Sequence, residues 1–275
     1  MKHAPVVRIG AGAASPLHAV REIWDYRDLF GALGTRDLRL RYRQTFLGVA
    51  WVILQPLAAA GIFAFVFGSI AHVPTDGQPY VLFALAALTG WNFFSSVITR
   101  ASMSLIQNPQ LVTRVYFPRL ILPLAVVPAA LVDLLVTLAA FAVIAVLQGR
   151  GFDARILALP FVIVLLGALA LGTGFAAAAL AVRYRDVQYL LPVAIQLALY
   201  ASPVAYSATA VPARWQALYY ANPLAAPLEL MRWSLLGTPA PAPRQLAYSA
   251  AVAAALILIG VTVFRQIERS FADEI

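Results

Sequence analysis

Few residues in this 275-residue chain are of the types that carry out enzyme chemistry. It contains no cysteine, which excludes disulfides, thiol catalysis and sulfur-ligated metals. Its three histidines, His3, His18 and His72, lie far apart in polar segments, so we expect neither a metal site nor a nucleophile. The sole lysine is Lys2, and a Walker A loop needs a lysine after a glycine-rich turn to reach the nucleotide phosphates. We therefore expect no catalytic residue and no ATP hydrolysis in this chain.

Asp133 is the one carboxylate within a long apolar stretch. A carboxylate in lipid costs several kcal/mol unless it is protonated or paired, so it should face other helices. It could relay protons or ions, or it could make a structural contact with a hydroxyl or with the helix end that carries Arg100. Because a proton-coupled carrier usually has several such acids, we favour the structural contact.

A stripe of polar and aromatic residues marks the fifth apolar stretch. Tyr189, Gln196 and Tyr200 follow one another at intervals of seven and four, which places them on one helix face, and Tyr206 ends the stretch. The stripe could line a channel, with the tyrosine rings offering flat faces to sugars. It could equally form hydrogen bonds between helices. The sequence leaves both interpretations open.

The segment before the first apolar stretch carries four arginines, Arg36, Arg39, Arg41 and Arg43. The first, second and fourth lie within about 60° of one another on a helix. The pattern predicts a basic amphipathic helix along the inner leaflet, where arginines meet anionic headgroups. A sharper interpretation is a clamp for phosphate or pyrophosphate, which guanidinium groups bind in a bidentate manner.

The composition predicts an all-α, polytopic membrane protein. Hydrophobic residues make up 62% of the chain and charged residues 12%, with a mean hydropathy of +0.81, whereas soluble domains are about 45–50% apolar and about 25% charged. No secretory signal peptide is visible, so we expect the first apolar helix to remain as an anchor. Spans of about 20 apolar residues are predicted at 46–70, 80–101, 120–147, 156–182, 187–206 and 246–265.

The arginines predict the orientation of these spans. With the N-terminus inside, the inner segments and adjoining helix ends hold 15 of the 20 Lys and Arg residues. Six spans then place both the 1–45 arm and the 266–275 tail in the cytoplasm. This distribution also explains the net charge of +8 without a nucleic-acid partner.

The outer segment 207–245 has apolar runs that are too short to cross a bilayer but are rich in Trp and Tyr, which favour the lipid–water interface. We expect a re-entrant pair of short helices here. The alternative is an ordinary surface loop with amphipathic turns.

Four blocks of the sequence, in order, resemble the permease subunit of bacterial polysaccharide ABC exporters, the group that exports O antigen and teichoic acid. They are "RDLRLRYRQTFLGVAWVILQP" (36–56), "NPQLVTRVYFPRLILPL" (108–124), "YASPVAYS" (200–207) and "NPLAAPLELMR" (222–232). The resemblance covers nearly the whole chain. It specifies the family more strongly than the cargo.

The resemblance implies a homodimer in the bacterial inner membrane that binds two copies of a separate nucleotide-binding subunit, which would hold ATP and Mg. This chain itself would bind no cofactor. A coupling helix at 105–119 would seat in the ATPase, with 182–188 as a second contact. The residues implied in this coupling are Asn108, Pro109, Gln110, Leu111, Val112, Arg114, Tyr116, Phe117, Pro118, Arg119, Arg183, Arg185 and Asp186.

The expected function is export of an undecaprenyl-pyrophosphate-linked polysaccharide, with O antigen as the first candidate. By resemblance, the arginine helix lies where the pyrophosphate enters, and spans one and five with the re-entrant pair form the channel walls and outer lid. The alternatives are an exporter of the same fold for teichoic acid, capsule, drugs or small lipids, and a proton-coupled carrier that uses Asp133.

Overall fold

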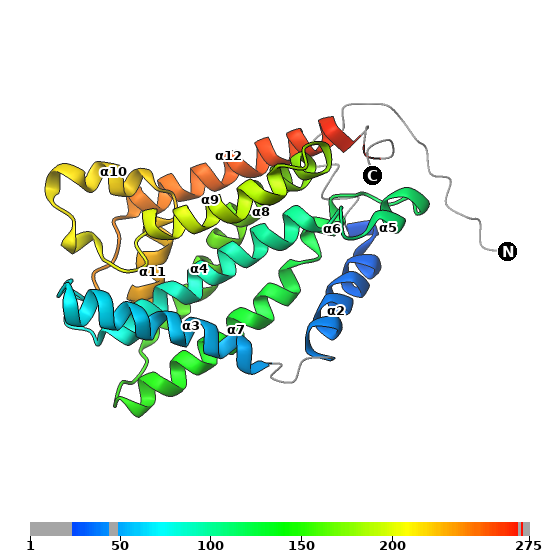
Figure 1. Ribbon diagram of the computed structural model, residues 1–275. Helices are drawn as coiled ribbons and strands as arrows, with labels where there is room; N and C mark the ends of the chain where they lie inside the picture. The colour runs from blue at the N-terminus through cyan, green and yellow to red at the C-terminus, as the bar shows by residue number, and fades with distance from the viewer. Residues whose placement is uncertain (1–23, 44–48, 269–270, 272–275) are drawn as a thin grey trace.

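The computed structural model describes residues 24–43, 49–268 and 271, and every regular element in these ranges is a helix (Figure 1). Five helices among the described residues are long and apolar enough to cross a membrane. Their bounds agree with five of the six predicted spans to within a few residues: Ala50–Ile70, Tyr80–Met103, Ile121–Leu147, Ala154–Arg183 and Pro243–Glu268.

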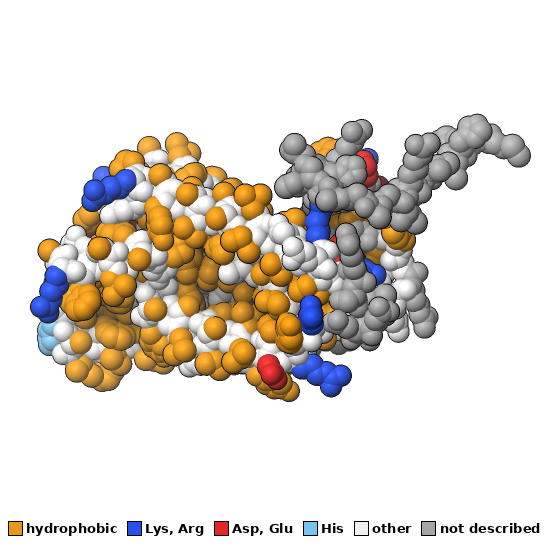
Figure 2. All heavy atoms as spheres, turned by 90° about the horizontal axis from the view of Figure 1, so that it is seen from above, with side chains coloured by type: hydrophobic (Ala, Val, Ile, Leu, Met, Phe, Trp, Pro, Cys, Tyr) orange, Lys and Arg blue, Asp and Glu red, His pale blue; other side chains and the backbone are white. Residues whose placement is uncertain are grey.

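These segments form a bundle around α4 (Tyr80–Met103), which is the most buried of the five. It packs mainly against α3 (Val49–Phe63), α7 (Val127–Leu147) and α8 (Leu159–Arg183). Hydrophobic side chains cover the middle of the face drawn in Figure 2, while Lys and Arg side chains lie toward its two ends. This distribution is typical of a bundle whose outer surface faces lipid.

The last helix, α12 (Pro243–Glu268), packs closely against α8 because glycines lie at their contact. A Cβ atom on Gly260 would lie 2.2 Å from the carbonyl oxygen of Gly172, and one on Gly172 would lie 2.6 Å from the α12 backbone. Small residues allow such backbone approach between helices in membranes. The two glycines of the sequence LGTGF at 171–175 thus serve helix packing.

The predicted span at 187–206 forms a shorter helix, α9 (Val187–Ala201). Its 15 residues correspond to about 22 Å, less than the ~30 Å hydrocarbon layer. The helix stops because Ser202 precedes Pro203 and adopts an extended backbone, with φ −98° and ψ 152°. A sixth complete crossing remains a prediction.

The segment 207–245 contains two short α-helices, α10 (Gln216–Ala221) and α11 (Ala225–Leu236), after two single 3₁₀ turns. Neither is long enough to cross a bilayer, as the sequence indicated. Most of α11 is buried against α4 and α8, and it ends at Gly237 in the left-handed region, with φ 70°. This packing argues against a loop lying free on the surface, while its depth in lipid remains a prediction.

At the opposite end of the bundle from α10 lie α2 (Arg27–Arg43), α5 (Pro109–Arg114) and α6 (Ile121–Leu124) (Figure 1). The predicted helix at 105–119 is thus wrong in length. Pro109 opens α5 at its first turn, where its missing N–H costs nothing, and the chain is extended at Val115 before Phe117–Pro118. We call this end of the bundle the α5 end.

Candidate functional site

The segment 108–119 connects α4 to α6 at the α5 end. Asn108 joins three elements: its side-chain amide donates to the carbonyl oxygen of Ser104, the C-cap residue of α4, at 2.8 Å, and its Oδ1 accepts from the Arg36 guanidinium of α2 at 2.6 Å. Its backbone oxygen accepts the first hydrogen bonds of α5, from Leu111 and Val112. Movement of α5 is therefore tied to both α2 and α4.

The side chains of this segment divide into an outer and an inner set. Tyr116 is 67% exposed and Val115 50%, whereas Val112 and Phe117 are buried in a core with the end of α12. Pro109 and Gln110 are exposed, Leu111 and Pro118 are half-buried, and the Arg114 side chain lies outside the described residues. The outer set forms an aromatic and apolar surface that a partner could contact.

Arg119 belongs to the inner set. Its guanidinium donates to the backbone oxygens of Glu268 at 2.7 Å and Val112 at 3.5 Å, and it lies 5.7 Å from the ring centre of Phe271. These contacts tie the segment to the C-terminal end of α12. Arg119 is therefore a weaker candidate for contact with a partner than Tyr116, whose side chain is exposed.

The second predicted contact is the turn between α8 and α9. Arg183, Arg185 and Asp186 are all exposed there, and the guanidinium of Arg183 lies over the Tyr184 ring at 5.5 Å. This turn lies at the α5 end of the bundle (Figure 1). Both predicted contact segments therefore share one end of the molecule.

The basic helix is confirmed in its backbone as α2 (Arg27–Arg43). Arg36 is exposed and contacts Asn108. The side chains of Arg39, Arg41 and Arg43 lie outside the described residues, so their common face remains a prediction.

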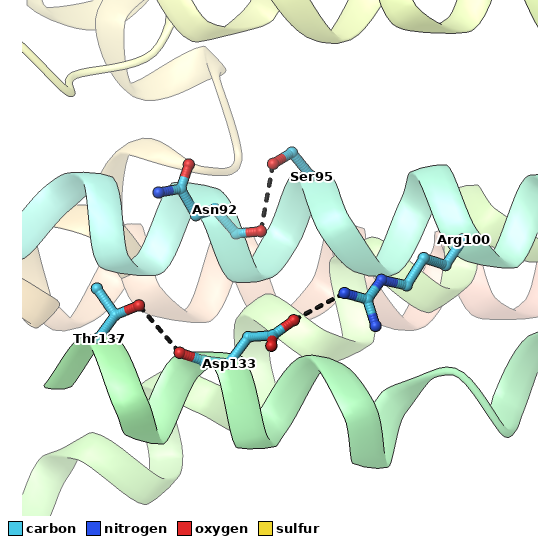
Figure 3. A network of polar contacts seen from close by, with 5 residues as sticks. All are labelled: Asn92, Ser95, Arg100, Asp133 and Thr137. Atoms are coloured by element: carbon cyan, nitrogen blue, oxygen red, sulfur yellow. Dashed lines mark hydrogen bonds and ion pairs between the residues drawn. The ribbon is translucent and has the colours of Figure 1, made fainter. Parts of the chain in front are cut away.

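Asp133 pairs with Arg100. The Asp133 carboxylate and the Arg100 guanidinium are 2.7 Å apart, and their side chains are 14% and 24% exposed (Figure 3). The Thr137 hydroxyl donates to the Asp133 backbone oxygen at 2.9 Å. This is the structural contact that the sequence favoured: the pair links α4 to α7 and compensates the charge of each partner.

The ion pair lies in the wall of a cavity of about 580 Å³ between α3, α4, α7 and α9. One face of α4 supplies a polar stripe to this cavity, and Gln55 and Gln196 face it from α3 and α9. The stripe consists of Asn92, Ser95, Ser96, Thr99 and Arg100. Pro56 and Pro192, which interrupt the backbone hydrogen bonding of α3 and α9, also line it.

The predicted stripe on α9 is only partly reproduced. Tyr189 and Tyr200 are 78% and 62% exposed, and Gln196 is exposed at the cavity, so packing within this chain does not account for the three side chains. Tyr206 does not continue the stripe: its ring packs against Tyr219, with ring centres 6.0 Å apart. The exposed face of α9 is available to a channel or to another subunit.

Sequence reasoning missed a buried polar network at the α10 end. Arg232 was expected in an outer loop, but it is 1% exposed. Its guanidinium donates to the backbone oxygens of Pro203, Val204 and Tyr206, at 2.6, 2.7 and 3.1 Å, and it stacks 4.0 Å from the ring centre of Phe83. Arg232 thereby binds carbonyl oxygens of the non-helical chain just beyond the end of α9.

Glu229 forms the second half of this network, one helical turn before Arg232. Its carboxylate accepts hydrogen bonds from the hydroxyls of Tyr219 and Tyr220, at 2.5 and 2.8 Å, and from the backbone N–H of Ala208 at 2.9 Å. Burial, with the nearby Glu229 charge, raises the pKa of Tyr219, so its hydroxyl remains a donor. The sequence signal that could have indicated this network is the pair Glu229 and Arg232, an acidic and a basic residue three positions apart in an apolar run.

Comparison with known proteins identifies the family of this chain. The family model of the ABC-2 type transporter matches residues 28–236. The chain belongs to the ABC-2 type transporter family. The match extends from α2 to the end of α11, so it includes the segment 108–119, the cavity and the Arg232 network. Membership implies a separate ATP-binding subunit as partner, consistent with the lack of a Walker A lysine.

The relatives of this ABC-2 transporter are named for polysaccharide export. It is 27% identical over 190 residues to the O-antigen export system permease protein RfbA of Myxococcus xanthus, covering 69% of this chain and 72% of that one. The protein of the same name from Klebsiella pneumoniae is 25% identical over 250 residues, with 90% and 94% covered. The polysialic acid transport protein KpsM of Escherichia coli is 25% identical over 244 residues, with 87% and 93% covered.

Proposed function

We propose that this ABC-2 permease is the channel-forming subunit of an ATP-driven exporter of undecaprenyl-pyrophosphate-linked polysaccharide, with O antigen as its cargo. The observation that carries the proposal is the similarity over nine-tenths of the chain to a permease named for O-antigen export. The capsule alternative is supported by the polysialic acid transporter, which covers almost as much of the chain. Teichoic acid, drugs and small lipids remain alternative cargoes for the same fold.

The α5 end is proposed to face the cytoplasm, with two copies of the ATP-binding subunit docked on it. The arginine count of the inner segments supports this orientation. Tyr116 and Val115 would supply the exposed anchor, while Asn108 and Arg119 would transmit movement to α2, α4 and α12. The exposed turn with Arg183, Arg185 and Asp186 would form the second contact.

The channel is proposed to form between two copies of the chain. Exposed aromatic and aliphatic side chains on α3 and α9 support this, because a homodimer would cover them or use them to line a path for sugar rings. They include Trp51, Leu54, Tyr189, Leu197 and Tyr200. We propose that Arg36, Arg39, Arg41 and Arg43 on α2 meet the lipid pyrophosphate at the entrance.

A carrier that works alone through Asp133 is less favoured, because Asp133 is paired with Arg100 and the chain belongs to an ATP-dependent family. The test is deletion of the gene, followed by measurement of surface polysaccharide and of drug tolerance, which separates a glycan exporter from a drug exporter. We expect loss of the surface glycan, restored by the wild-type chain only when the ATP-binding subunit is also present. An unchanged glycan, or restoration without that subunit, would contradict the proposal.

A further inference from the structure

The end of the chain packs behind the segment 108–119, at the α5 end of the molecule (Figure 1). Phe264, near the end of α12, and Phe271, which follows the bounds of that helix, are both 0% exposed. Their rings meet edge to face, with ring centres 5.4 Å apart and planes at 89°. Both belong to one cluster of buried side chains with Val112 and Phe117, the inner apolar residues of the segment. The aromatic end of the chain therefore completes the core behind α5.

Arg119 connects this aromatic end to the segment by a second, polar route. Its guanidinium donates to the backbone oxygens of Glu268 and Val112 and lies 5.7 Å from the ring centre of Phe271. A guanidinium can make all these contacts because it carries five N–H donors and its charge is attracted to the face of an aromatic ring. One side chain thus contacts α5, α12 and the Phe271 ring together.

We infer that Phe264, Glu268 and Phe271 form a clasp that positions the segment 108–119, and that export depends on it. These three residues are called the C-terminal clasp. The inference rests on the proposed function, in which the ATP-binding subunit docks on this segment. It goes beyond that function because it gives a role in coupling to the end of the chain, which lies outside the family match at 28–236. Phe264 and Phe271 are positioning residues, since both rings are buried and act through the segment.

The clasp is important because the segment is anchored at both of its ends. At its beginning, Asn108 is hydrogen-bonded to α2 and to the C-cap of α4. At its end, Arg119 and the clasp tie it to α12, which packs closely on α8 through Gly172 and Gly260. A force on the exposed Tyr116, between the two anchors, therefore moves helices at both ends. Without the clasp, the segment would turn about Asn108, and less of the movement would reach α12 and α8.

The clasp lies on the opposite side of the segment from the side chains proposed to contact the ATPase. Val115 and Tyr116 are exposed, whereas Val112 and Phe117 are buried in the same cluster as the clasp. Loss of the clasp therefore removes no side chain that the partner would contact. It changes how firmly the segment is held, so binding of the ATP-binding subunit and its effect on export can be measured separately.

The first measurement is hydrogen–deuterium exchange of the full-length chain in nanodiscs, read at the hydrogen-bonded amides of Leu111, Val112 and Val115. Phe271→Ala is compared with Phe161→Ala, a matched control, because Phe161 is 51% exposed on α8 and is not part of the cluster. We expect exchange about tenfold faster in Phe271→Ala, because loss of a buried ring lowers the free energy of local opening, and unchanged exchange in Phe161→Ala. Phe271→Leu, which keeps most of the buried apolar volume, should restore most of the protection.

The second measurement uses the deletion strain, complemented with each variant together with the ATP-binding subunit. Surface glycan is compared at equal membrane levels of the complex, so a variant that merely folds less well is not scored as uncoupled. We expect Phe271→Ala to retain co-purification and ATP hydrolysis but to lower surface glycan about tenfold, as for loss of a buried aromatic contact. The double variant Arg119→Ala/Phe271→Ala should lower it no further than the stronger single variant, because both side chains act through one contact.

Three results would overturn the inference. They are equal exchange rates in Phe271→Ala and Phe161→Ala, normal surface glycan in Phe271→Ala, and a double variant whose loss is the product of the two single losses. A failure of the proposed function gives a different pattern. If the gene deletion leaves the surface glycan intact while Phe271→Ala still speeds exchange, the proposed function fails and the positioning role of the clasp stands.

Discussion

Replacing Arg232 by methionine tests whether the buried guanidinium holds the α10 end of the protein together. Methionine fills a similar volume and keeps the apolar contact with Phe83, but it cannot donate to the carbonyl oxygens of Pro203, Val204 and Tyr206. These oxygens belong to residues just beyond the end of α9, where no helical N–H reaches them.

The size of the effect follows from the three short hydrogen bonds. A hydrogen bond to a charged group contributes about 1.5–3 kcal/mol, so the three together give about 4.5–9 kcal/mol. Removing a buried charge recovers part of its desolvation cost. We therefore expect Arg232→Met to lower the free energy of unfolding by about 3–5 kcal/mol.

The assay is equilibrium unfolding of the purified chain in detergent micelles with increasing sodium dodecyl sulfate, followed by tryptophan fluorescence. Arg244→Met is the control, because Arg244 is exposed on the same segment of the chain, and we expect a change within about 0.5 kcal/mol. Arg232→Lys should be intermediate, since a single ammonium replaces a planar fork. Equal stabilities of the Arg232→Met and Arg244→Met proteins would refute the role given to this network.

The remaining predictions concern the α5 end and the bundle. Tyr116→Ala should weaken the binding free energy for the ATP-binding subunit by about 2 kcal/mol, as for an aromatic anchor at an interface. Co-purification of the two subunits should fall accordingly. Arg119→Ala should leave the amount of co-purified ATP-binding subunit unchanged and lower glycan export per ATP hydrolysed. Loss of co-purification in Arg119→Ala but not in Tyr116→Ala would contradict the division into outer and inner side chains. Asp133→Asn should lower stability by about 1–3 kcal/mol, allowing for partial exposure, without changing how ATP-driven export responds to a pH gradient across proteoliposomes. Gly260→Ala, which puts a methyl group 2.2 Å from a backbone oxygen of α8, should cost about 1–3 kcal/mol in thermal unfolding, while Gly61→Ala, with open space around it, should not.

Five of the six spans predicted from the sequence are membrane-capable helices in the described part of the chain. Long apolar runs have one stable solution in lipid, a helix that satisfies its own backbone. The sequence also favoured a structural contact for Asp133, with a hydroxyl or with the helix end that carries Arg100 as the possible partners. An unpaired carboxylate within a membrane span is costly, and the structure pairs it with Arg100. The family was indicated by the four sequence blocks, which the family match bears out over residues 28–236.

Helix lengths at the two ends were less predictable. The helix that the resemblance implied at 105–119 and the span predicted at 187–206 are both longer than the helices in the structure. At 187–206 the apolar composition continues past the point where the backbone turns. Prolines at positions 118 and 203 mark these turns. A proline turns the chain locally, whereas the apolar sequence around it favours continuing the helix. Where the helix ends depends on which backbone carbonyl oxygens find hydrogen-bond donors elsewhere in the protein.

By itself, then, the sequence determined that this chain is a helical membrane protein, because hydrophobic length is a property of composition. Its four sequence blocks also indicated the transporter family. Only the tertiary structure decided that Arg232 is a buried clamp, that Arg119 faces inward, and that Phe264 and Phe271 complete the core behind the segment 108–119. With the same neighbouring residues in the sequence, an arginine side chain can extend into water or toward a group of backbone carbonyl oxygens. Which of these it does depends on residues up to 149 positions away.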